Sequence, residues 1–175
     1  SPGDFGVVAV LFALTSVDVA VCLGYERALA VPRNGTEAAE LAWIALASTA
    51  VIAAVTALAV AALAAGNLWP IVTDNGSWLP WTCGLGLVAY GVAQVGTLSA
   101  IRNQAYARVA LAKFCQLGAT GGAQALLGTS SLGAAGLILG HIGGLTICCL
   151  LLAGPLHRTL AGTHPRSLAA LAATA

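Results

Sequence analysis

Charged side chains are scarce in this sequence, where Asp, Glu, Lys and Arg together make up 7% of 175 residues. A soluble globular domain carries about 25% of these residue types. Hydrophobic residues reach 59%, which leaves little polar surface to face water. We therefore expect an integral membrane protein. The formal net charge of +1 provides no electrostatic footprint for nucleic acid, so no nucleic-acid partner is expected.

The sequence also lacks the motifs that carry familiar enzyme chemistry. It contains no Gly-x-Ser-x-Gly elbow, His-Glu-x-x-His motif, Asp-rich metal motif or P-loop. The cysteines lie in apolar runs without Cys-x-x-Cys or Cys/His ligand spacing, which is typical of small apolar membrane residues. They are Cys22, Cys83, Cys115, Cys148 and Cys149. We expect no enzyme activity, no cofactor and no metal site.

Long apolar runs predict an all-α, polytopic transmembrane bundle. Each run is longer than the roughly 20 residues that a helix needs to cross a bilayer. We expect five spans, at residues 5–31, 40–65, 79–101, 104–127 and 132–153. Residues 1–155 then form the bundle, and Gly154-Pro155 ends it before an interfacial or cytoplasmic tail at 156–175. Methionine is absent and the chain opens Ser1-Pro2, which indicates a missing or processed N-terminus. No signal peptide is visible.

The basic residues set the expected orientation. All seven lie in or beside the segments that join spans one and two, join spans three and four, or follow span five: Arg27, Arg33, Arg102, Arg108, Lys113, Arg158 and Arg166. The positive-inside rule makes this side cytoplasmic, with Ser1 outside and the C-terminus inside. Trp69, Trp78 and Trp81 gather at the opposite end, either as aromatic interface anchors or as platforms for sugar stacking.

One polar stripe runs along the fourth expected span. On a helix with about 100° per residue its members fall within about 80° of one another. They are Tyr106, Lys113, Gln116, Thr120 and Gln124. A cation and two amides at membrane depth are costly unless they face a packed interior or a wet cavity. The stripe therefore predicts a substrate-binding cavity, with a snorkelling Lys113 and a packing face as the alternative. Gln94 and His141 are weaker candidates for the same space.

A second group of candidates lies in the first expected span. Asp18 is near its middle and shares a helical face with Cys22 and Tyr25. An intramembrane carboxylate indicates a proton or cation site, or a neutral carboxyl bonded to a neighbouring helix. Glu26 and Arg27 lie at the cytoplasmic end as a candidate inner gate or a snorkelling pair.

Glycines recur at four-residue spacing in two of the expected spans. Gly136, Gly140 and Gly144 form one ridge, and Gly118 with Gly122 forms another. Small residues at this spacing let helix backbones approach closely. We expect both ridges to lie in helix–helix contacts.

Four segments, in the right order along the chain, resemble bacterial polysaccharide exporters, the Wzx-type flippases of lipid-linked oligosaccharides in the multidrug/oligosaccharidyl-lipid/polysaccharide superfamily. The first is Pro-Gly-Asp-Phe-Gly at residues 2–6, and the second is Tyr-Glu-Arg-Ala-Leu-Ala-Val-Pro-Arg at residues 25–33. The others are residues 107–116, with a basic residue and Gln three apart, and residues 136–140.

The resemblance implies helices two to six of the first lobe of a two-lobe transporter, without helix one and the second lobe. It also implies a function in the bacterial inner membrane: flipping undecaprenyl-pyrophosphate-linked oligosaccharide, the repeat unit of lipopolysaccharide or exopolysaccharide, by alternating access. Its expected partners are that lipid-linked sugar, membrane lipid and the missing second lobe. Two alternatives stay open, a drug or cation antiporter of the same superfamily and a non-transporting membrane subunit.

Overall fold

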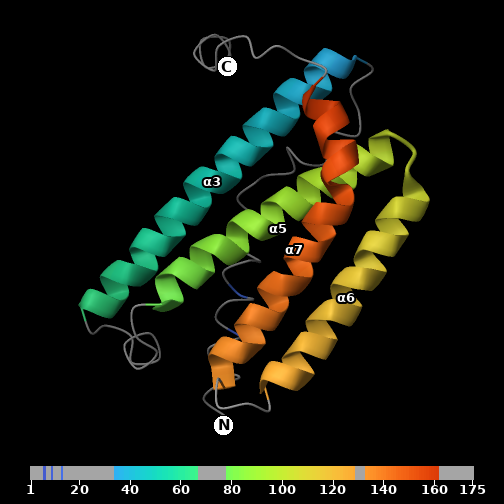
Figure 1. Ribbon diagram of the computed structural model, residues 1–175. Coiled ribbons are helices and arrows are strands. Elements are labelled where there is room, and N and C mark those ends of the chain that lie inside the picture. Colours follow the sequence, from blue (N-terminus) through green and yellow to red (C-terminus); the bar gives the residue numbers. More distant parts are fainter. Residues whose placement is uncertain are drawn as a thin grey trace.

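The computed structural model describes residues 34–66, 78–128 and 133–161, together with the single positions Gly6, Ala9 and Ala13. The three continuous ranges form four helices (Figure 1): α3 (Gly35–Ala65), α5 (Trp78–Arg102), α6 (Tyr106–Gly128) and α7 (Gly133–Leu160). Helix is the regular structure throughout these ranges, so the all-α class is confirmed.

Three of the described helices, α3, α5 and α7, are long and apolar enough to cross a membrane. This is fewer than the five spans expected from the sequence. The first expected span, residues 5–31, lies outside the described ranges. Helix α6 has 23 residues but is not among the three, because Lys113, Gln116 and Gln124 lower the hydropathy of its central part.

Successive helices run in opposite directions, and α7 lies between α5 and α6 (Figure 1). It packs along both of them and also touches α3. Helix α5 in turn packs along α3. Helix α6 contacts α7 extensively and meets α5 only weakly. It therefore lies at the edge of the described bundle.

Alanines let α3 and α5 pack closely. Ala38, Ala42 and Ala45 are buried at three- and four-residue spacing on α3. One turn further, Thr49 lies against Gly91 of α5, where an added Cβ would overlap the threonine side chain. Lipid is as apolar as a leucine side chain, so close backbone packing of this kind is what holds membrane helices together.

Helix α5 ends in a Schellman motif that turns the chain into α6. Gln104 has φ 55°, the left-handed conformation that usually requires glycine. Its N–H donates to the Ile101 carbonyl at 2.9 Å, and the Ala105 N–H donates to the Ala100 carbonyl at 2.8 Å. This tight turn makes α6 antiparallel to α5.

Helix α7 does not end at Gly154-Pro155 as expected. It continues to Leu160 with Pro155 inside it, so its last turn uses residues assigned to the tail. Proline removes one N–H donor from a helix, but the Pro155 ring is fully buried, and packing of the ring offsets that loss. The Thr159 hydroxyl donates to the Pro155 carbonyl at 3.2 Å.

The glycine ridge of α7 lies directly against α6. A Cβ at Gly136 would lie 2.5 Å from the Leu127 carbonyl oxygen, and one at Gly140 would lie 3.0 Å from the Gln124 backbone nitrogen. The expectation of close packing is confirmed for this ridge. At Gly118 and Gly122 of α6, by contrast, a Cβ would meet no described atom within 4 Å, so the second ridge forms no helix contact within the described ranges.

Candidate functional site

The polar stripe of α6 faces its neighbour α7 over its last two turns. The Gln124 amide nitrogen donates to the Leu137 carbonyl at 3.1 Å. Thr120 lies against Gly144, where a Cβ would overlap the threonine hydroxyl. Gln124 and Thr120 therefore occupy the contact between two helices, and their polar atoms have partners or close neighbours inside the protein.

Lys113 lies nearer the start of α6. The residue is half-buried, and its ammonium donates to the Gln116 side-chain oxygen at 3.2 Å. An ammonium has three donors, so two are left for other acceptors. The amide nitrogen of Gln116 adds further donor capacity beside it. Lys113 and Gln116 thus form a compact donor group about two turns inside α6.

Tyr106 does not join this group. It is the first residue of α6, and its side chain is 62% exposed. It precedes Lys113 by seven residues, which is about 10 Å along a helix. The structure therefore divides the stripe into an exposed aromatic, a half-buried donor pair and a packing segment.

Helix α5 carries a pair of hydrogen-bonded polar side chains, of which the sequence analysis predicted only one. The Gln94 amide nitrogen donates to the Tyr90 hydroxyl oxygen at 2.6 Å. Tyr90 packs against the apolar cluster that joins α5, α6 and α7, as does Cys149 of α7. The Cys149 thiol donates to the Ala89 carbonyl at 3.4 Å. Ala112, next to Lys113 on α6, belongs to the same cluster, so polar groups of α5 and α7 lie around a junction that α6 also joins.

The sequence identified Gln94 as a weak candidate and missed Tyr90. The available signal was their spacing of four residues, which places two polar side chains side by side on a helix. His141, the other weak candidate, is half-buried on α7. Four candidates lie outside the described residues: Asp18, Tyr25, Glu26 and Arg27.

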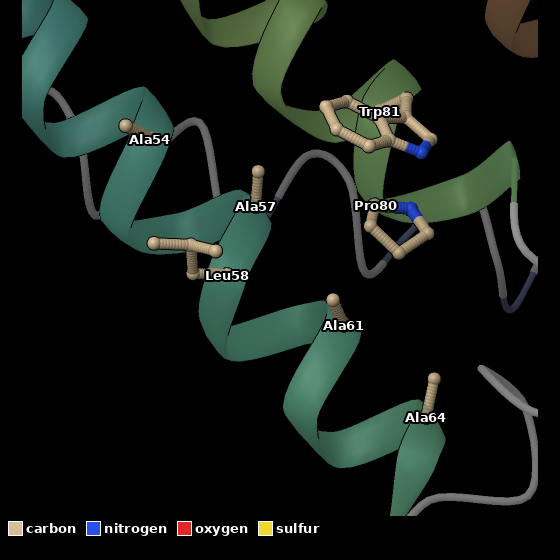
Figure 2. Close-up of a pocket in the computed structure, with 7 residues that line it drawn as sticks. All are labelled: Ala54, Ala57, Leu58, Ala61, Ala64, Pro80 and Trp81. Carbon is tan, nitrogen blue, oxygen red and sulfur yellow. The ribbon is translucent and has the colours of Figure 1, made fainter.

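A separate apolar groove lies between α3 and α5 at the end of the bundle opposite Arg102. Figure 2 shows Ala57, Ala61 and Ala64 of α3 across from Pro80 and Trp81 of α5. The cavity volume is about 470 Å³. Among the described residues that line it, the only polar side-chain group is the indole N–H of Trp81, a side chain that is 76% exposed. The described part of the groove therefore suits hydrocarbon.

Cationic side chains lie where α5 and α7 end and α6 begins. The Arg102 guanidinium donates to the Asn34 carbonyl at 3.1 Å, which ties α5 to the start of α3. Within residues 34–66, 78–128 and 133–161, the carboxylates are Glu37 and Glu40 on the first two turns of α3. The described part of α5, α6 and α7 therefore carries positive charge with no carboxylate of its own.

No protein-family model matches this chain, and no curated protein or solved structure is similar to it.

Proposed function

We propose that this chain is part of a membrane transporter that moves an undecaprenyl-pyrophosphate-linked oligosaccharide across the bacterial inner membrane by alternating access. The proposal includes five spans, with the C-terminus in the cytoplasm. Three helices suited to a membrane support the location, and the family resemblance of the sequence segments supports the substrate class. The proposed partner for the transport path is a second lobe facing this one.

The half-buried Lys113 is the observation that carries the proposal. It lies about two turns inside α6, hydrogen-bonded to Gln116. In the proposed five-span arrangement this position is at membrane depth, where a cation without a function is costly. Its remaining donors suit a pyrophosphate oxygen. At 4 Å an ammonium and a phosphate attract by about 4 kcal/mol at an effective dielectric of 20.

A non-transporting membrane subunit is the second candidate, and a specific observation favours it. Thr120 and Gln124 pack against α7, so part of the stripe acts as a structural contact and adds nothing to a sugar-binding wall. The antiporter alternative has less support, since the described carboxylates lie at the start of α3, which packs along α5 and touches α7, whereas Lys113 lies on α6.

Binding of the lipid-linked pyrophosphate to the purified 175-residue chain tests the proposal. We expect Lys113→Ala to weaken binding of undecaprenyl pyrophosphate about 10- to 150-fold, which corresponds to about 1.5–3 kcal/mol for a hydrogen bond to a charged group. Lys113→Arg should retain most of the affinity. Undecaprenol, which lacks the charge, is the matched ligand control.

Equal affinity of wild type and Lys113→Ala for the pyrophosphate would contradict a role for Lys113 in transport. The subunit alternative would then be favoured. Binding of undecaprenol as tight as that of undecaprenyl pyrophosphate would have the same meaning, because the recognition would rest on the hydrocarbon alone.

A further inference from the structure

The start of α6 and the end of α7 bring exposed basic side chains together. Arg108 lies in the first turn of α6, and its guanidinium crosses to α7, where one of its terminal nitrogens is 3.0 Å from the position that a Cβ on Gly154 would occupy. Because residue 154 has no side chain, the guanidinium can lie close to the α7 backbone at this point. Arg108 therefore lies over α7 while remaining exposed.

Two further basic side chains lie beside that position. His157 and Arg158 follow Gly154 by three and four residues, so all three share one face of α7. Both side chains are exposed. Leu156 and Leu160, each about 160° from Arg158 on the helix, pack instead against the cluster formed with α3. Arg158 therefore lies on the side of α7 away from the carboxylates of α3.

Among the described residues, the charge at this corner is unbalanced. The first turn of α6 contains no acidic residue and carries Arg108 where a helix dipole favours a negative charge. On α6 and α7 no Asp or Glu is present at any described position. An anion between the two helix ends would offset both the side-chain charge and the dipole.

We propose that Arg108, His157 and Arg158 form a binding surface for the phosphate of an anionic phospholipid at the membrane surface. The position of the cluster favours a lipid over a soluble anion. Arg108 and Arg158 lie at the ends of two helices that run through the bundle side by side (Figure 1), and α7 is long and apolar enough to span. Helix ends of this kind lie at headgroup depth. This proposal does not rest on the transport proposal.

Competition between two lipids with the same acyl chains tests the surface. The purified full chain is offered equal amounts of phosphatidylglycerol and phosphatidylcholine, and the lipids retained are counted by native mass spectrometry. Each basic residue near an anionic surface contributes about 1 kcal/mol, or about fivefold. The Arg108→Gln/Arg158→Gln double variant should therefore lose about 25-fold in preference for phosphatidylglycerol.

Lys113→Gln is the matched control. It removes one charge from the same helix, but five residues deeper than Arg108, which is about 7.5 Å along the axis. The preference of this variant should equal that of the wild type. The same control separates the two proposals, because Lys113→Gln should weaken pyrophosphate binding and the double variant should change lipid preference.

Retention of charge provides a check on folding. Arg108→Lys/Arg158→Lys should keep most of the preference, since the attraction to a headgroup is mainly electrostatic. Loss in this variant as complete as in the glutamine variant would show a structural effect and overturn the proposal. A wild type without preference, an equal loss in Lys113→Gln, or release of the lipid by inorganic phosphate would also overturn it.

Discussion

Thr120 of α6 packs directly on the backbone of Gly144 of α7, so closely that a Cβ at residue 144 would overlap the threonine hydroxyl. The same Cβ would lie 2.8 Å from the Gln116 carbonyl oxygen. Both neighbours belong to α6, and one of them is helix backbone, which has little room to yield. The spacing between α6 and α7 therefore depends on the absence of a side chain at this residue.

Gly144→Ala should destabilise the bundle by about 1–3 kcal/mol, the usual cost of inserting atoms into a packed contact. Thermal unfolding in detergent, followed by circular dichroism, measures the change. Gly143→Ala is the matched control on the same helix, because a Cβ there meets no described atom within 4 Å. It should be neutral or slightly stabilising, since alanine is the better helix former. Equal melting temperatures for the two variants would contradict the close packing.

Gly91→Ala should separate α3 from α5 in the same way, and a second change should restore the contact. The neighbour at this crossing is the Thr49 side chain, which is 2% exposed and has a hydroxyl without a hydrogen-bond partner in the described structure. Thr49→Ala makes room for the new methyl group. We expect the double variant to recover most of the stability that Gly91→Ala loses. Additive losses in the double-mutant cycle would show that the two residues do not compete for space.

Gln124→Leu removes the donor to the Leu137 carbonyl while keeping a side chain of similar size. Hydrogen bonds between membrane helices contribute about 0.6 kcal/mol on average and at most about 1.7. We expect a loss of stability in that range with little effect on ligand binding, because Gln124 is engaged with α7. A large loss of pyrophosphate binding without loss of stability would instead indicate that Gln124 lines the substrate-binding cavity.

Gln104→Gly should stabilise the turn between α5 and α6 by about 1 kcal/mol. Gln104 has φ 55°, and the left-handed conformation costs residues with a Cβ about 1–2 kcal/mol relative to glycine. The greater freedom of glycine in the unfolded chain offsets part of the gain. Gln104→Ala, which keeps the Cβ, should show no such increase. A lower melting temperature for the glycine variant would contradict the Schellman geometry.

The orientation of the bundle can be read with topology reporters. A reporter fused after Arg33 or Arg102 should be found in the cytoplasm, and one fused after Asn75 in the periplasm, because the basic residues favour the cytoplasmic side. Helix α5 lies between these two reporter positions in the sequence and is long and apolar enough to cross a membrane, so the reporters after Asn75 and Arg102 are expected on opposite sides. The reversed labelling pattern would place Arg108 and Arg158 at the outer surface.

The sequence by itself determined the class of this protein and part of its packing. Few charges and long apolar runs are enough to predict membrane helices. A helix satisfies all the backbone hydrogen bonds of such a segment within the bilayer, where no water is present to do so. The boundaries of α3, α5, α6 and α7 followed to within a few residues at most ends. The ridge of Gly136, Gly140 and Gly144 was also readable, since four-residue spacing places small residues on one face.

Only the tertiary structure decided which of the two glycine ridges lies in a helix–helix contact. Gly118 and Gly122 have the same spacing as the ridge of α7 but meet no described neighbour. Spacing defines a face, and the partner that covers it depends on how whole helices pack. For the same reason the sequence could not divide the polar stripe, where Lys113 bonds to Gln116 while Gln124 bonds across to α7.

The end of α7 also combines residues that were recognisable in the sequence with a helix end and contacts that only the structure shows. Gly154-Pro155 is a common helix stop in sequence, yet the helix continues to Leu160, because a buried proline ring can be stabilised by its neighbours. Gly154, without a side chain, lets the Arg108 guanidinium lie close to the α7 backbone. The residue types were visible in the sequence, but their meeting required α6 and α7 to lie side by side, and packing between distant segments is a property of the folded chain.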